Sequence, residues 1–195
     1  MNPWEMSPTG ASAELAVQIC ALVPRLETER LILRAPVLPD FETFNAIFES
    51  ERSEWMGGPF DRSGAWDEFT ECASGWLLRG HGAWAIEDRA TGDTLGFTLV
   101  HMEFGDREPE LGWFLTEAAE GHGYALEAAG AARRFAHDTL QLTSLVSYID
   151  PPNARSTSLA KRLGAKRDQQ AETAFSEDVQ VWRHWGPANK TGGQN

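Results

Sequence analysis

A predicted strand and a predicted helix are joined by the stretch TEAAEGHGYA, residues 116–125. Its two glycines, Gly121 and Gly123, fall where the helix is expected to begin at Tyr124. The first amide groups of a helix have no partner within the helix, and the helix dipole is positive there, so an anion is attracted. Glycine lets a phosphate approach the backbone because it has no Cβ. The stretch is therefore typical either of a tight turn or of a phosphate-binding loop.

Two familiar phosphate-binding loops do not fit this stretch. In the dinucleotide-binding pattern GxGxxG, Leu126 would stand where the third glycine or alanine belongs, and the loop after Leu115 is too long. A Walker loop would need Gly-Lys followed by Ser or Thr, which the sequence does not contain. A nucleotide-dependent oxidoreductase and a P-loop enzyme are therefore disfavoured.

Hydrophobic periodicity predicts the elements around this loop. The expected strands cover residues 31–34, 82–87, 95–100, 110–115, 145–149 and 179–185, and the two late helices cover residues 124–140 and 153–163. The first of two earlier helices starts at Asp40, which is expected to cap it. The second starts after Ser63 and has Leu77 on its apolar face. Hairpins dominate the first half, and one strand–helix–strand crossover in the second half makes its two strands parallel or nearly so. The predicted fold class is α+β, with a mixed, mostly antiparallel sheet flanked by helices.

The composition predicts one globular domain with a short extension at each end. The chain has 195 residues, of which 42% are hydrophobic and 24% are charged, as in ordinary globular proteins. Residues 1–24 are expected to form an N-terminal extension, residues 25–185 the domain, and residues 186–195 a C-terminal tail. The apolar stretch 16–23 follows acidic residues and not basic ones, so it is interpreted as a short helix or arm rather than a signal peptide.

The charge and the scarce cysteines exclude several classes of protein. A net charge of −12 argues against a nucleic-acid partner, because such proteins present a basic face to phosphates. The negative charge serves solubility or concentrates a cationic substrate. Neither the two cysteines nor the five histidines have metal-binding spacing, so no metal is expected. No apolar run is long enough to span a membrane, so we expect a soluble, cytoplasmic protein without a membrane partner.

Taken together, several segments resemble the GNAT N-acetyltransferase superfamily and, within it, the RimJ/RimL-like branch. The matching segments are LETERLILR at 26–34, ELGWFL at 110–115, GHGYALEA at 121–128, NARS at 153–156 and LGA at 163–165. They are spread over about residues 25–185. The resemblance implies an acetyl-CoA-dependent N-acetyltransferase domain whose two central parallel strands splay apart, so that the pantetheine arm of the coenzyme enters the gap.

The resemblance also implies where acetyl-CoA binds. The expected coenzyme-binding residues are Trp113, Phe114, Leu115, Gly121, His122, Gly123, Tyr124, Ala125, Asn153 and Ser156. The loop would hold the pyrophosphate, and a backbone N–H near Phe114 would hold the oxyanion of the reaction. Asn153 either only caps the helix that it starts or also bonds the coenzyme arm.

The sequence departs from the superfamily pattern at two positions. Glu120 stands where a neutral or basic residue usually begins the coenzyme loop, and it is expected to point outward. Ala160 stands where many members carry a tyrosine that protonates the departing thiolate. The branch commonly lacks that tyrosine, and Ser156 matches the serine suggested in its place.

Transfer of an acetyl group to an amine requires a base and a proton for the leaving thiolate. Glu110 is the candidate base because it lies on the central strand, and its alternative role is that of a structural salt-bridge partner. Glu103, His101 and Tyr148 are weaker substitutes. Ser156 either assists the thiolate or only bonds the helix backbone.

The acceptor is not specified by the sequence. The resemblance allows a protein N-terminus or a small amine, bound against the two early helices, with Trp55, Trp66 and Trp84 lining the wall. The alternative is a catalytically silent domain that senses acetyl-CoA or docks a partner. A homodimer is left open.

Overall fold

The computed structural model describes residues 2–176 and 178–187. They form an eight-stranded sheet with the strand order β1-β2-β3-β4-β5-β6-β8-β7. The strands are β1 Leu26–Glu27, β2 Leu31–Arg34, β3 Ala83–Asp88, β4 Thr94–His101, β5 Glu110–Leu115, β6 Leu145–Ile149, β7 Lys166–Arg167 and β8 Gln180–Trp185. The α-helices are α1 Gly10–Cys20, α2 Phe41–Phe48, α3 Arg62–Arg79, α4 Tyr124–Asp138, α5 Ala154–Arg162 and α6 Gln169–Glu172. Short 3-10 helices are η1 Pro3–Glu5, η2 Leu38–Asp40, η3 Glu51–Met56 and η4 Glu117–Ala119.

The predicted α+β class is confirmed by the pairing of the strands. All neighbouring strands run antiparallel except β5 and β6, which are parallel. These two strands share a single register pair, Glu110 with Val146. The backbone N–H of Val146 donates to the carbonyl of Pro109 at 3.0 Å, and the Ser147 hydroxyl donates to the carbonyl of Leu111 at 2.6 Å. Beyond this point the two strands diverge, so the centre of the sheet is open on one side.

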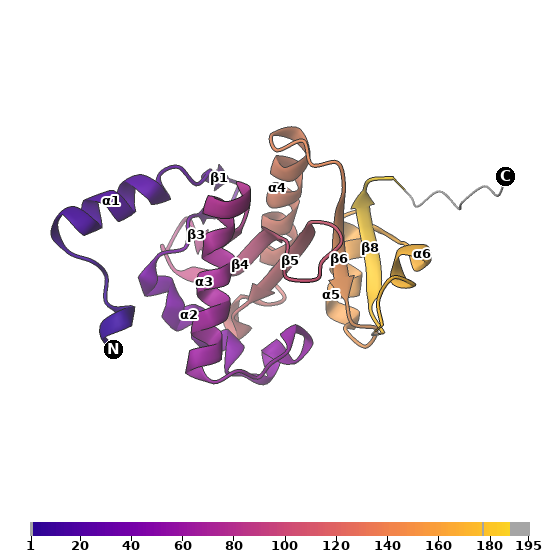
Figure 1. The fold of residues 1–195 in the computed structure, drawn as a ribbon, viewed down its shortest axis with the longest axis horizontal. Helices are drawn as coiled ribbons and strands as arrows, with labels where there is room; N and C mark the ends of the chain where they lie inside the picture. Colours follow the sequence, from indigo (N-terminus) through magenta and orange to yellow (C-terminus); the bar gives the residue numbers. More distant parts are fainter. Residues whose placement is uncertain (1, 177, 188–195) are drawn as a thin grey trace.

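The two faces of the sheet are covered by different helices (Figure 1). On one face α4 presents buried alanines, among them Ala128 and Ala132, to large strand residues such as Leu33 and Trp84. Small side chains let a helix axis approach the sheet closely. On the other face α2 and α3 bring a cluster of phenylalanines, in which Phe44 stacks with Phe48 at a centroid distance of 4.1 Å. The edges of β5 and β6 therefore lie between an alanine-rich layer and an aromatic layer.

The N-terminal segment is attached to this body at both of its ends. Glu5 in η1 is buried and accepts a hydrogen bond from Arg62 Nε at 2.7 Å, at the start of α3. At the other end the Trp84 indole donates to the carbonyl of Pro24 at 2.7 Å. Between these contacts α1 has no buried residue and extends away from the domain (Figure 1). Among the described residues, no helix combines the length and apolarity that a membrane crossing needs.

Local expectations failed at two positions in the early helices. Asp40 is the N-cap residue of α2, but its side chain does not bond the helix amides and accepts hydrogen bonds from Arg34 Nη1 at 2.7 Å and from the Thr94 hydroxyl at 2.7 Å. Leu77 does not join the core, and 75% of its surface is exposed. The buried side of α3 is formed by Ala65, Phe69, Cys72 and Gly75. Most of the expected tail, residues 188–195, lies outside the described residues.

Candidate active site

The loop before α4 has the backbone that a phosphate site requires. Gly121 and Gly123 both adopt positive φ angles, 78° and 82°. Gly123 is the N-cap of α4, and no side chain in the described part of the protein bonds the first amides of that helix. A Cβ added at Gly121 would meet no atom within 4 Å, so the loop is open on that side. The loop therefore offers a positive helix terminus without a side-chain cap, which suits an anionic ligand.

Arg30, in the turn between β1 and β2, supports this loop. Its Nη1 donates to the carbonyl of His122 at 3.0 Å, and its guanidinium lies 4.5 Å from the centre of the Tyr124 ring. Glu127 in the first turn of α4 accepts from Arg30 Nε at 2.8 Å. Sequence reasoning missed Arg30 because no local signal links residues that are 97 positions apart.

The three expected residues at the end of β5 point to different layers. Phe114 packs against α2, with its ring centre 5.2 Å from that of Phe48. Trp113 packs in the opposite direction, near α4 and α5, and Leu115 is buried with the α4 layer. On β4, Gly96 lies close to the end of β5, and a Cβ added to it would lie 2.3 Å from the Phe114 carbonyl oxygen.

The backbone of β5 continues past the point where pairing with β6 stops. The carbonyls of Pro109 and Leu111 face β6, since both accept hydrogen bonds from that strand. Successive residues of a strand turn their backbone groups to opposite neighbours, so Trp113 is the next residue directed into the opening. The backbone N–H near Phe114 that is directed into the opening is thus that of Trp113, and its contact with an oxyanion stays a prediction.

The start of α5 lies on the other side of the opening. Asn153 is its N-cap, and Asn153 Oδ1 accepts from the Ser156 backbone N–H at 3.1 Å. The capping role expected for Asn153 is confirmed, whereas its contact with a coenzyme stays a prediction. Ser156 is half-buried in the first turn. Ala160 stands where many family members carry the tyrosine that protonates the thiolate, and it is fully buried in the core with Trp182.

Glu110 stands where β5 and β6 separate. Its Oε1 accepts a hydrogen bond from the Tyr148 backbone N–H at 3.1 Å. The ion pairs of the described residues do not include Glu110, so the alternative role of a salt-bridge partner gains no support there. Burial raises the pKa of Glu110 well above its ordinary value, and the charges of Asp106 and Glu103 act in the same direction. A raised pKa is typical of a carboxyl group that exchanges protons near neutral pH.

The three weaker candidates for the base differ in their proton affinity. Burial lowers the pKa of His101 to about 4 and raises that of Tyr148 to about 12. The Glu103 side chain is exposed, but desolvation of its carboxyl group and neighbouring acids raise its pKa to about 7. Tyr148 therefore keeps its proton at neutral pH, and His101 is a weak base. Glu103 has the proton affinity of a base but lies in the turn rather than beside the opening.

Glu120 is placed between two arginines instead of free in solvent. Its carboxylate pairs with Arg52 of η3 and with Arg155 Nη1 of α5, the latter at 2.8 Å. Arg52 also lies 3.4 Å from Glu117. The negative charge at the start of the coenzyme loop is thus balanced within the protein. Sequence reasoning predicted neither partner, because both come from distant elements.

The three tryptophans expected in an acceptor wall do not share one face. Trp55 in η3 is 37% exposed, and Trp66 packs edge-on against Phe41 at 5.0 Å between ring centres. Both belong to the side of α2 and α3. Trp84 is fully buried on the side of α4, where it contacts Phe135. The expectation for Trp84 was wrong because β3 is covered on both faces, so alternation along the strand does not tell which face holds the ligand.

No group of three His, Cys, Asp or Glu side chains in residues 2–176 and 178–187 is arranged to hold a metal ion. The residues expected to bind the coenzyme lie along the end of β5, the glycine loop and the start of α5. An open pair of strands beside an uncapped helix start fits the extended arm and the pyrophosphate of coenzyme A.

Comparison with known proteins identifies the family to which the chain belongs. Residues 30–166 match the model of the acetyltransferase (GNAT) domain. The crystal structure of an acetyltransferase from Agrobacterium tumefaciens str. C58 superposes with a TM-score of 0.78 at 40% identity, covering 83% of this chain and 94% of that one. A ribosomal-protein-serine acetyltransferase structure from Vibrio cholerae gives 0.63 at 22% identity, with 82% and 96% covered, which shows a shared fold. The uncharacterized protein YkkB of Bacillus subtilis (strain 168) is 27% identical over 148 residues, 74% of each chain. GNAT acetyltransferases use acetyl-CoA as the cosubstrate, and this chain belongs to the GNAT acetyltransferase family.

Proposed function

We propose that the protein transfers the acetyl group of acetyl-CoA directly to a primary amine, with Glu110 as the base. The observation that carries this proposal is the position of Glu110 at the single register pair of β5 and β6, where the strands separate. A side chain at this point reaches both the opening between the strands and the face covered by α2 and α3.

The face on which Glu110 lies supports an acceptor site on the side of α2 and α3. Leu111 packs with the α4 layer, whereas Phe114 packs against α2. Side chains alternate along a strand, so Glu110, Gly112 and Phe114 share the face of α2 and α3. An amine bound there would approach the thioester from the side opposite α4, with Glu110 beside its nitrogen.

The proton transfers of the reaction require two side chains, one to accept a proton and one to stabilise the thiolate. The ammonium group gives one proton to Glu110, the neutral nitrogen forms a bond to the acetyl carbon, and the carbon–sulfur bond breaks as the nitrogen releases a second proton for the thiolate. The leaving thiolate then needs a hydrogen bond or a proton, and the half-buried Ser156 in the first turn of α5 is the proposed donor. The backbone N–H of Trp113 is the proposed donor to the carbonyl oxygen as it becomes negative.

The branch and the acceptor are part of the same proposal. The opening segment LETERLILR and the fold shared with the ribosomal-protein-serine acetyltransferase support the RimJ/RimL-like branch. A protein N-terminus and a small amine are the two acceptor classes. The pairing of Glu120 with Arg52 and Arg155 favours an enzyme over a silent domain, because the acid at the coenzyme loop is neutralised by the protein itself.

The test is the rate of thiol release from acetyl-CoA with a panel of primary amines, followed by mass spectrometry of the products. Glu110→Gln keeps the size and the hydrogen-bonding carbonyl of the side chain but cannot accept a proton. We expect kcat/KM to fall by about 100-fold or more, the usual contribution of a general base. Glu14→Gln on the exposed helix α1 makes the same charge change away from the site and should leave the rate unchanged.

The pH dependence separates a base from a structural side chain. Below its raised pKa Glu110 is protonated in the parent, so parent and variant converge there. Above the pKa of the amine, about 10 for a primary alkylamine, no base is needed and they converge again. The parent-to-variant ratio should therefore pass through a maximum between these two pKa values. A constant ratio across pH would assign Glu110 to structure alone.

A further inference from the structure

The ladder between β5 and β6 stops after one register pair, Glu110 with Val146. In a regular parallel ladder the next bond would run from the Tyr148 N–H to the Leu111 carbonyl, and the one after it from the Trp113 N–H to the Tyr148 carbonyl. The first of these bonds is replaced, because both of its groups have side-chain partners. The opening between the strands therefore begins where two side chains take the hydrogen bonds of the backbone.

The two side chains act from opposite faces of the sheet. On the face of α2 and α3, Glu110 Oε1 accepts from the Tyr148 N–H at 3.1 Å. On the face of α4, the Ser147 hydroxyl donates to the Leu111 carbonyl at 2.6 Å. Ser147 shares this face with Leu145, which packs in the α4 layer, because side chains alternate along a strand. The ladder can continue only if both of these side-chain bonds are broken.

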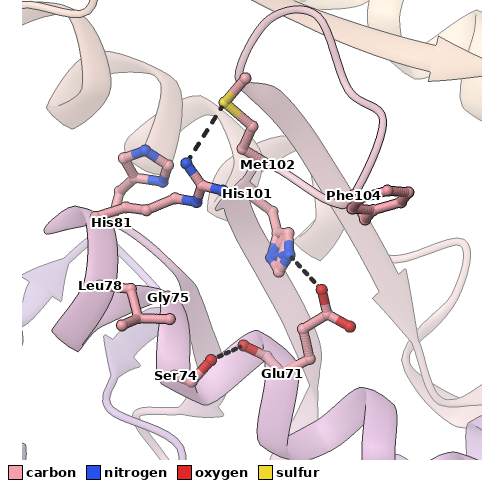
Figure 2. Close-up of a pocket in the computed structure, with 9 residues that line it drawn as sticks. Glu71, Ser74, Gly75, Leu78, His81, His101, Met102 and Phe104 are labelled. Carbon is pink, nitrogen blue, oxygen red and sulfur yellow. Dashed lines mark hydrogen bonds and ion pairs between the residues drawn. The ribbon is translucent and has the colours of Figure 1, made fainter.

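The β4 neighbour of Glu110 is directed elsewhere. His101 of β4 is the register partner of Glu110 in the antiparallel pair. Figure 2 shows its ring turned toward α3, where Nε2 lies 3.9 Å from Oε1 of Glu71. The imidazole is thus directed to the helix, whereas the Glu110 carboxyl group is directed to the backbone of β6.

His184 of β8 fixes the direction of the Ser147 hydroxyl. Its Nε2 lies 3.1 Å from Ser147 Oγ, and both side chains are buried. The hydroxyl has one proton, which goes to the Leu111 carbonyl because a carbonyl can only accept. Burial, with the charge of Arg133 acting in the same direction, lowers the pKa of His184 to about 4, so the imidazole is neutral. Its single proton is then on Nε2, which donates to Ser147 Oγ.

The replacement releases two backbone groups from the ladder, the Trp113 N–H and the Tyr148 carbonyl. A buried carbonyl such as that of Leu111 needs a donor, and in a sheet the ordinary donor is the neighbouring strand. With Ser147 as the donor, the strands stay apart without leaving this carbonyl unpaired. The amide groups of a pantetheine arm in the opening can then pair with the two released groups.

We propose that Ser147 is a positioning residue which, oriented by His184 and together with Glu110, holds β5 and β6 apart and keeps the Trp113 N–H available to the coenzyme. The expected effect on binding rests on the proposed function, which places acetyl-CoA in this opening. The effect on the backbone of β5 and β6 does not depend on it.

The test compares acetyl-CoA binding by Ser147→Thr and Ser147→Val. Both variants add a methyl group at the same place and suit a strand, but only Ser147→Thr keeps the hydroxyl. Without the hydroxyl the Leu111 carbonyl is free to accept the Tyr148 N–H, and the ladder extends. Calorimetry should therefore show about 10-fold or more weaker binding in Ser147→Val than in Ser147→Thr, because the coenzyme must first break the added backbone bonds.

Amide hydrogen exchange without coenzyme is the second measurement. Extension of the ladder pairs the Trp113 N–H with the Tyr148 carbonyl, so this amide should exchange about 10-fold or more slowly in Ser147→Val than in Ser147→Thr. A mere loss of structure would make the exchange faster. If the added methyl group prevents folding, Ser147→Ala compared with the parent makes the same test without it.

Two results would overturn the positioning role. One is equal affinity for acetyl-CoA with and without the hydroxyl, and the other is a Trp113 amide that exchanges as fast or faster when the hydroxyl is removed. His184→Phe should weaken binding in the same direction, and His184→Gln should restore it because its amide can donate to Ser147 Oγ. Parent-like binding in His184→Phe would overturn the part assigned to His184.

The outcomes also separate this inference from the proposed function. Glu110→Gln keeps an acceptor for the Tyr148 N–H, so it should keep the affinity for acetyl-CoA while the rate falls. If the Ser147 variants behave as expected but no amine is acetylated, the proposed function fails and the positioning role stands. If amines are acetylated and the Ser147 variants bind acetyl-CoA equally, only the positioning role fails.

Discussion

Two helices of this protein, α4 and α5, begin beside the opening between β5 and β6, and they begin differently. At α5 the Asn153 side chain accepts a hydrogen bond from the Ser156 amide, as most helix starts require. At α4 the cap is Gly123 in a left-handed conformation, and none of the side chains within residues 2–176 and 178–187 bonds the first amides. The first amides of α5 thus find a hydrogen-bond acceptor within the protein, whereas those of α4 are left to solvent or a ligand.

The difference separates a structural helix start from a binding one. A side-chain cap contributes about 1 kcal/mol to stability, so its omission at α4 is a cost to the folded protein. The loop before α4 is instead supported from outside, since Arg30 bonds the His122 carbonyl and stacks on Tyr124. Because no side chain of the described residues occupies them, the first amide groups of α4 stay available to a ligand. The following substitutions test this interpretation.

The largest effect is expected at the uncapped start. Gly123→Asp places a side chain and a negative charge where the coenzyme phosphates are proposed to lie. The affinity for acetyl-CoA should fall by about 100-fold or more, the scale of one lost charge-assisted hydrogen bond with added repulsion. Calorimetry on the folded variant measures this loss.

A matched control exists after α5. Gly164 has a φ angle of 85°, close to that of Gly123, and a Cβ there would meet no atom within 4 Å. Gly164→Asp makes the same chemical change with the same backbone strain, away from the loop. It should lower stability to a similar extent and leave coenzyme affinity unchanged. Equal losses of affinity in the two variants would remove the distinction between the two helix starts.

A smaller effect is expected in the first turn of the capped helix. Ser156→Ala removes the hydroxyl proposed to assist the thiolate, so kcat should fall by roughly 10- to 100-fold with nearly unchanged coenzyme affinity. Ser158→Ala, on the exposed side of the same turn, is the control. Parent-like turnover together with a lower melting temperature would make Ser156 part of the helix structure only.

The smallest effect is expected at the cap itself. Asn153→Ala should lower the free energy of unfolding by about 1 kcal/mol, as measured by urea denaturation, because the Ser156 amide loses its acceptor. Asn153→Asp keeps an acceptor oxygen and should restore most of that stability. Coenzyme affinity decides the remaining question: a change in Asn153→Ala beyond the loss of stability would mean that Asn153 also contacts the coenzyme arm.

Features that depend on neighbouring residues in sequence were predictable. The strands at 31–34 and 145–149 have the bounds that their apolar runs predict, and Asn153 caps α5 as its position before a helical pattern indicates. The glycines at the start of α4 adopt the positive φ angles for which glycine is suited. The short strands β1 and β7 were missed, since two residues carry no period.

Features that depend on long-range pairing were not predictable. Asp40 was expected to cap α2 but is held by Arg34. Glu120 was expected to point outward, and its pairing with Arg52 and Arg155 was not foreseen, because no local pattern relates these residues to it. Trp84 was placed in the acceptor wall but lies under α4, because a strand covered on both faces is apolar on both. The backbone conformation of the glycine loop and the cap of α5 were thus easier to predict than the ion pairs around them.

The attachment of the N-terminal segment has a consequence for engineering. Glu5 is tied to Arg62 at one end and Pro24 to Trp84 at the other, while α1 between them buries no side chain. A helix that contributes nothing to the core can be lengthened, replaced or interrupted without exposing the interior. Because both anchors would survive, a fluorescent reporter or an affinity handle inserted within α1, which extends away from the sheet, would sit outside the domain on two tethers (Figure 1).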